Sequence, residues 1–128
     1  MINGQFVDAS HGETFDVLNP ADGSLITKVS AANEDDVNKA VESCTDAAKI
    51  WKGVPPFVKS SLMNKYADKI EENLDELATL ESEDVGKIRE NAIGDMMFSA
   101  MIVRYYAGLA NNIHGKSYAR DSYGIANN

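Results

Sequence analysis

The chain has 128 residues, of which 44% are hydrophobic and 25% charged, which is the length and composition of one globular domain or less. Lysine and arginine total 12 against 20 aspartate and glutamate, and the net charge of −8 argues against nucleic acid and anionic membrane as partners. Cys44 is the only cysteine, which excludes an internal disulfide and favours a reducing compartment. Residues 1–10 lack a signal-peptide pattern and no apolar run approaches a membrane span, so we expect a soluble, cytoplasmic protein.

The first thirty residues predict short β-strands separated by turns. Asn3-Gly4 and Asp22-Gly23 are dipeptides typical of tight turns, and apolar residues alternate around them. Three short strands are expected, in the segments INGQFVD (2–8), ETFDVL (13–18) and SLITKVS (24–30).

Helices are predicted from Asn33 onward. The Asn33 side chain is expected to cap the first helix, and the three acidic residues that follow suit the positive end of the helix dipole. Apolar residues then recur at three- and four-residue intervals as far as Trp51, which gives this helix one apolar face that includes Cys44. Gly53 and Pro55-Pro56 are expected to end this helix and to start the next.

Two further apolar patterns complete the helical part. The second helix is predicted by four side chains at strict four-residue spacing: Val58, Leu62, Tyr66 and Ile70. Asn73 is expected to cap a third helix that continues the apolar spacing, and this helix is expected to end at residues 84–87. The last helix is expected over about residues 88–112, before His114-Gly115.

This pattern divides the chain into three parts. Residues 1–30 should form β-strands and turns, residues 33–116 should be helical, and residues 117–128 should be a loop or tail. The fold class expected for the chain alone is therefore α+β, with short strands followed by three or four helices.

The last predicted helix is apolar on nearly all sides. Between Met96 and Ile113 the clearly polar residues are Ser99, Arg104 and the pair Asn111-Asn112. A helix of this kind is normally enclosed, whereas each earlier helix offers only one apolar face to cover it. We therefore expect a longer chain, a partner subunit or a ligand to cover the rest. The alternative is that the helix is simply the central one of a small bundle.

The residue types that carry catalysis do not form a recognisable site. Cys44 lies on an apolar helix face and is expected to be a buried, unreactive core residue. The two histidines, His11 and His114, are far apart in the sequence, and no metal-ligand spacing is present. The glycines stand singly, without a Gly-rich phosphate loop. Composition and spacing alone thus predict no active site.

Three ordered segments nevertheless resemble one family. INGQFVDASHGETFDVLNPADGSLITKVSAANEDDVNKAV resembles the opening of the NAD(P)-dependent aldehyde dehydrogenases, with its strand, its NPATGE-like turn and its first helix. LMNKYADKIEENLDELATLESEDVGKIREN and RYYAGLANNIHGK are similar to the segments that follow in the family. The resemblance runs over residues 2–116 in register. The family pattern is not followed beyond Lys116, where SYARDSYGIANN lacks the expected proline.

The resemblance implies an N-terminal portion of an α/β, Rossmann-type enzyme. The family oxidises an aldehyde to a carboxylic acid through a thiohemiacetal, with NAD or NADP as the cofactor. Its catalytic cysteine, glutamate base, oxyanion asparagine and dinucleotide-binding segment come later than these residues. The resemblance therefore implies no catalytic and no cofactor-binding residue in this chain, no turnover by the chain alone, and the remainder of the enzyme or a full-length relative as its partner. The alternative is a non-catalytic remnant that acts as a helical partner-binding module.

Three positions carry a role by this resemblance. Asp84 matches a carboxylate that, with backbone carbonyls near Leu18, holds a structural monovalent cation in many members; the alternative is a plain carboxylate at the end of a helix. Phe98 matches a position that lines the substrate tunnel; the alternative is core packing.

Overall fold

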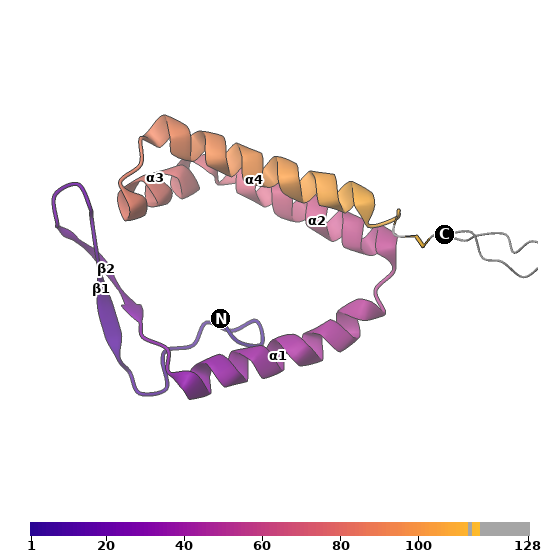
Figure 1. The fold of residues 1–128 in the computed structure, drawn as a ribbon, viewed down its shortest axis with the longest axis horizontal. Coiled ribbons are helices and arrows are strands. Elements are labelled where there is room, and N and C mark those ends of the chain that lie inside the picture. The colour runs from indigo at the N-terminus through magenta and orange to yellow at the C-terminus, as the bar shows by residue number, and fades with distance from the viewer. Residues whose placement is uncertain (113, 116–128) are drawn as a thin grey trace, which may run out of the picture.

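The computed structural model describes residues 1–112, 114 and 115, and within them the chain forms an open frame (Figure 1). A hairpin stands at one end, one helix runs along one side, and three helices pack together along the other side. The elements are β1 (Thr14–Leu18), β2 (Leu25–Ser30), α1 (Glu34–Lys52), α2 (Pro56–Glu72), α3 (Leu74–Val85) and α4 (Arg89–Leu109). This confirms the expected α+β class with four helices. The predicted tail, 117–128, lies outside the described residues.

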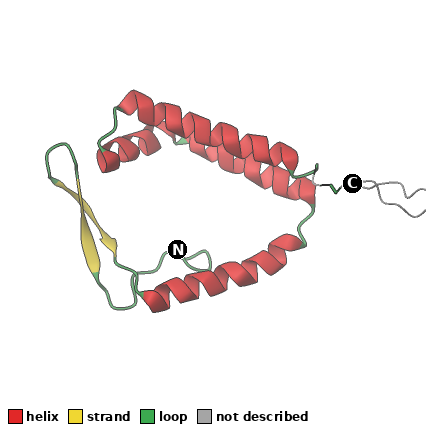
Figure 2. Ribbon diagram, in the orientation of Figure 1, coloured by secondary structure: helices red, strands yellow, loops and turns green. Residues whose placement is uncertain are grey.

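The prediction of a strand over residues 2–8 is wrong. Residues 2–8 form only an isolated bridge between Ile2 and Gln5 around the Asn3-Gly4 turn. The reason is that polar groups of this segment bond to α1 side chains instead of to a neighbouring strand: the Asn3 N–H donates to Ser43 Oγ at 3.2 Å. The described residues therefore contain one two-stranded sheet, drawn in yellow in Figure 2.

The hairpin is antiparallel, and both backbone and side-chain hydrogen bonds close its turn. Phe15 pairs with Val29, and the register shifts between Val17 and Leu18. In the turn the Asn19 side chain accepts from the Ala21 N–H at 2.9 Å, a local bond typical of asparagine before a turn.

The start of α1 follows the sequence prediction closely. The Asn33 side chain accepts from the Asp36 N–H while the Asp36 carboxylate accepts from the Asn33 N–H, which is a complete capping box. Gly53 ends the helix as expected. However, α1 contains no buried residue, and Cys44 is exposed, so the prediction of a core cysteine is wrong. Cys44 is exposed because α1 runs apart from the other helices (Figure 1).

The core lies where α4 crosses α2 and α3. Its centre consists of Ala67 and Ile70 of α2 and Ala100 of α4, with three partly buried side chains packed against it: Leu77, Met96 and Val103. The two alanines are fully inaccessible, and their small side chains let the helix backbones approach closely. Asn73 separates α2 from α3, but its side chain donates to the Lys69 carbonyl and does not cap α3.

Only one side of α4 is covered by this packing. Phe98 and Tyr105 are 58% and 61% exposed, although both belong to the apolar helix singled out by the sequence. Among the described residues, no large side chain is fully buried. The alternative of a self-contained small bundle with α4 at its centre is therefore wrong, because α2 and α3 pack on the same half of the helix.

Candidate functional site

The exposed side of α4 carries an open depression of about 540 Å³. It is lined by Glu71, Leu74, Met97, Phe98, Met101 and Arg104. Phe98 faces this depression and is not part of the core, so the core-packing alternative for Phe98 is wrong. Its predicted place in a substrate tunnel stays a prediction, because the opposite wall would have to come from residues beyond those described.

Arg104 fixes the polar edge of this depression. Its guanidinium donates to Asp68 at 2.8 Å and also to Glu71, and both carboxylates belong to α2. The hydrogen bond to Asp68, and with it the one to Glu71, raises the pKa of Arg104 above its ordinary value. The side chain therefore stays charged and ties α4 to α2 beside the apolar residues.

The predicted cation site lies where the hairpin turn meets the end of α3. Gly86 ends α3 in the left-handed conformation with φ of 71°, and Pro20 lies directly against it. Leu18 ends the strand before this turn, so the structure brings the hairpin end close to the segment that contains Asp84. Asp84 is exposed and lines a cavity of about 370 Å³ between hairpin and helices, together with Glu81 and Glu83.

No group of three or more histidine, cysteine or carboxylate side chains among the described residues is arranged to hold a metal ion. A monovalent cation bound by Asp84 and backbone carbonyls would not need such a group. The cation role of Asp84 and Leu18 and the alternative of a plain helix-end carboxylate both stay predictions.

Lys87 is a structural centre that the residue pattern alone did not reveal. Its Nζ contacts Glu81 at 2.7 Å and Asp95 at 2.6 Å, and the Ser82 hydroxyl donates to its carbonyl. The hydrogen bonds to Asp95 and Glu81 raise the pKa of Lys87. These contacts fix the angle at which α4 leaves α3. The glycine before Lys87 was the only local sign of this turn.

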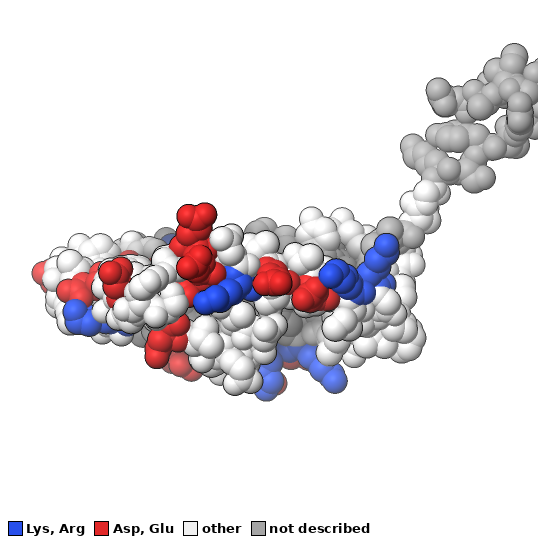
Figure 3. Space-filling view, turned by 90° about the horizontal axis from the view of Figure 1, so that it is seen from below, with Lys and Arg blue, Asp and Glu red and all other residues white. Residues whose placement is uncertain are grey.

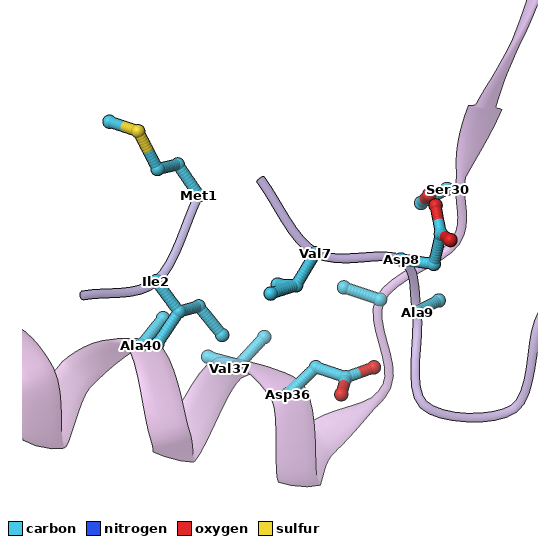
Figure 4. Close-up of a pocket in the computed structure, with 10 residues that line it drawn as sticks. Met1, Ile2, Val7, Asp8, Ala9, Ser30, Asp36, Val37 and Ala40 are labelled. Carbon is cyan, nitrogen blue, oxygen red and sulfur yellow. The ribbon is translucent and has the colours of Figure 1, made fainter. Parts of the chain in front are cut away.

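A third cavity, of about 250 Å³, lies between residues 1–9 and α1 (Figure 4). Ile2 and Val7 point onto Val37 and Ala40 of α1 in this view. At its edge the Asp36 carboxylate accepts from the Ser10 N–H at 3.1 Å, and this bond lowers the pKa of Asp36. The contact joins residues 26 positions apart, so no local pattern could have indicated it.

The remaining chemistry-bearing residues are not brought together. Cys44 lies on α1 in an exposed apolar group with Ala48 and Trp51. His11 lies 3.3 Å from Ser10 through Nδ1 and contacts the Asn33 side chain, so it belongs to the polar contacts at the start of α1. His114 is far along the chain, beyond α4.

The face of the molecule seen in Figure 3 is not dominated by one sign of charge. In the view of Figure 3, acidic and basic side chains alternate over the described residues and leave broad uncharged areas between them. A search of the described helices finds none with the length and apolarity that crossing a bilayer requires.

Comparison with known proteins then decides the family. The model of the aldehyde dehydrogenase family matches residues 6–127 of this chain. The chain belongs to the aldehyde dehydrogenase family. This confirms the resemblance seen in the sequence, and it accounts for the order of hairpin, α1 and packed helices.

Three solved structures show how much of an aldehyde dehydrogenase this chain represents. PnpE in complex with nicotinamide adenine dinucleotide is 40% identical, with a TM-score of 0.89 over 94% of this chain and 25% of its own. A mutant aldehyde dehydrogenase from Bacillus cereus is 35% identical, with a TM-score of 0.90 over 95% of this chain and 26% of its own. A mutant betaine aldehyde dehydrogenase from Staphylococcus aureus, solved with NAD⁺, is 30% identical, with a TM-score of 0.86 over 90% of this chain and 24% of its own. The chain thus spans about a quarter of the length of these aldehyde dehydrogenases.

Proposed function

We propose that these residues serve as the N-terminal part of an NAD(P)-dependent aldehyde dehydrogenase, a cytoplasmic enzyme that oxidises an aldehyde to a carboxylic acid. The observation that carries this proposal is the family match over residues 6–127 together with the exposed apolar side of α4. A monomer rarely leaves a contiguous apolar patch of that kind to water, so a cover from the rest of the enzyme accounts for it.

The proposed chemistry resides outside the described residues. In the family a cysteine forms a thiohemiacetal with the aldehyde, and NAD or NADP then serves as the oxidant. Cys44 cannot take the nucleophile's part, because it lies on α1 beside alanines and Trp51, with no base next to it among the described residues. The role of α4 is to support the substrate tunnel, into which Phe98 would point.

Neither the cavity beside α1 nor the cavity under the hairpin suits a dinucleotide cofactor. The cavity beside α1 carries the Asp8 and Asp36 carboxylates, and the cavity under the hairpin carries Glu81, Glu83 and Asp84. A pyrophosphate would meet negative charge in both places. The cofactor is therefore assigned to the remainder of the enzyme, and the 128-residue chain alone is expected to be inactive.

An absorbance assay for NADH or NADPH with a panel of aldehydes tests this proposal. A protein that contains these residues and continues into the catalytic part should produce reduced cofactor, whereas the 128-residue chain should produce none. Turnover by the purified chain would contradict the assignment, and so would a longer protein that binds cofactor but oxidises no aldehyde.

The partner expected for α4 is the remainder of the enzyme or a full-length relative. A second candidate function, a non-catalytic partner-binding module, is favoured by the same exposed apolar residues. Co-expression with a family member that lacks its own first quarter distinguishes the two. Restored activity supports the enzymatic reading, and a stable complex that shows no activity supports the binding module.

Asp84 and the carbonyl of Leu18 are proposed to hold a structural monovalent cation in the complete enzyme. The approach of Pro20 to Gly86 supports this, because it places the hairpin end beside the segment that contains Asp84. Melting temperature measured in sodium, potassium and choline salts tests it. A cation-dependent melting temperature that Asp84→Asn abolishes would support the site, and equal melting in all three salts would leave only the helix-end role.

A further inference from the structure

We propose that Asn3 is a site of spontaneous deamidation, and that the modification loosens the first turn of the chain from α1. The proposal concerns the turn at Asn3 and Gly4 and is independent of dehydrogenase chemistry. Both residues have positive φ, 50° and 73°. Ile2 and Gln5 exchange N–H···O bonds of 2.9 and 3.0 Å across the turn, which is the arrangement of a two-residue type I′ turn.

The structure singles out Asn3 among the asparagines. Deamidation requires the nitrogen of the following residue to reach the side-chain carbon of asparagine, and a side chain on that residue obstructs the approach. Asn3 is the only asparagine in the sequence that precedes a glycine. Asn3 and Gly4 are both exposed, and the Gly4 N–H donates none of the hydrogen bonds found among the described residues.

Five of the other described asparagines are held back for specific reasons. Asn19 precedes Pro20, whose nitrogen carries no hydrogen, so the reaction cannot start there. Asn33 precedes Glu34, whose side chain obstructs the approach, and its own side chain lies in the capping box of α1. Asn38, Asn64 and Asn91 lie inside helices, where the following N–H belongs to the helix hydrogen-bond ladder.

The reaction balances without an added reagent other than water. The Gly4 nitrogen loses its proton to base and bonds to Cγ of Asn3, which closes a five-membered imide. The Cγ–Nδ2 bond breaks, and the nitrogen leaves as ammonia with a proton taken from solvent. Water then opens the imide. Attack at Cγ gives aspartate, whereas attack at the former backbone carbonyl gives isoaspartate, which carries one extra carbon in the main chain.

The isoaspartate product removes the contacts that anchor this turn. In the unmodified chain, Ser43 Oγ donates to Asn3 Oδ1 at 2.7 Å and accepts from the Asn3 N–H at 3.2 Å. In isoaspartate the side-chain carbonyl becomes part of the backbone, so Ser43 loses this acceptor and the longer turn breaks the Ile2–Gln5 bridge. Residues 1–9 would then keep mainly the apolar contacts seen in Figure 4.

Peptide mapping by mass spectrometry tests the modification. The purified protein is incubated at mildly alkaline pH, digested, and searched for aspartate and isoaspartate at each asparagine. The proposal expects product at Asn3 well before any other described asparagine, at a rate that rises with hydroxide concentration. An unmodified Asn3, or equal rates at several helical asparagines, would overturn it.

Variants test the cause and the consequence. Gly4→Ala should remove most of the product; because Gly4 has positive φ, unchanged circular dichroism must confirm that the variant is folded.

Limited proteolysis should cleave residues 1–9 faster in the isoaspartate form, and Ser43→Ala should show the same gain without modification. Equal cleavage of the modified and unmodified forms would overturn the proposed loosening.

Discussion

Gly86 is the residue at which the fold depends most directly on the absence of a side chain. Its φ of 71° is left-handed, and a Cβ there would lie 2.8 Å from Pro20 Cγ. We expect Gly86→Ala to destabilise the protein by about 1–2 kcal/mol from the backbone conformation alone, with the Pro20 clash adding to it. Urea titration followed by helical circular dichroism measures this.

Gly94 provides the matched control for Gly86. It lies inside α4, and a Cβ added to it would meet nothing within 4 Å. Gly94→Ala should therefore stabilise the protein by about 1 kcal/mol, because alanine is the better helix former. If both substitutions shift the urea midpoint in the same direction, the account of Gly86 is wrong.

Asp36 should make the start of α1 sensitive to acid. Its carboxylate accepts a hydrogen bond from the Ser10 N–H, and this bond is the main reason why the pKa of Asp36 in the folded chain lies below the ordinary 3.8. A lowered pKa means that the contact stabilises the fold fully above pH 3.8 and is lost as pH falls through the lower folded value. The Ser10 amide shift in NMR should titrate with a midpoint below 3.8.

The Asp36→Asn variant checks this assignment. An asparagine can still accept the Ser10 hydrogen bond but does not titrate, so the acid-dependent shift of the Ser10 amide should disappear. A midpoint at or above 3.8 in the unmodified chain would contradict the proposed stabilisation.

At the residue scale the sequence predicted local contacts and missed distant ones. The Asn33 cap was predictable because its partner Asp36 is three residues away. The bond of Asp36 to Ser10 was not, because it spans 26 positions and depends on how residues 1–9 fold back. Cys44 was misplaced because an apolar helix face indicates burial only when a partner is present to cover it.

At the scale of the elements, the contact of α2 with α4 depends on small side chains. Ala67 and Ala100 are fully inaccessible where the helices cross. Ala100→Leu should push the helices apart and destabilise the protein by about 1–3 kcal/mol. The urea midpoint measures this, with Ser99→Leu as the control, because Ser99 is exposed on the same helix. Equal effects of the two substitutions would show that Ala100 is not at a packed crossing.

The elements were largely predictable, with one instructive exception. The structure confirms the Asn33 cap and the Gly53 end. Gly86 ends α3 within the break predicted at residues 84–87, whereas Asn73 does not cap α3 through its side chain. The last helix was expected over 88–112 and is found at Arg89–Leu109. The expected first strand is absent because a strand needs a neighbouring strand to pair with, and the segment of residues 2–8 bonds to α1 instead.

At the scale of the whole molecule, several elements leave an apolar face exposed to solvent. The hairpin, α1 and α4 all expose large apolar side chains, including Phe15, Ile50 and Phe98. The sequence predicted the need for a cover, because α4 is apolar on nearly all sides. It could not predict which faces stay open, since this depends on how α1 runs relative to α2 and α4.

The central claim is that this chain cannot cover the outer side of α4 by itself, and mild methionine oxidation read out by mass spectrometry tests it most directly. Met97 and Met101 are 56% and 55% exposed, whereas Met96 on the same helix is partly buried against the core. In the 128-residue chain Met97 and Met101 should oxidise well before Met96, and in a protein that continues into the catalytic part they should become protected. Oxidation of all three at the same slow rate in the monomeric chain would contradict the account.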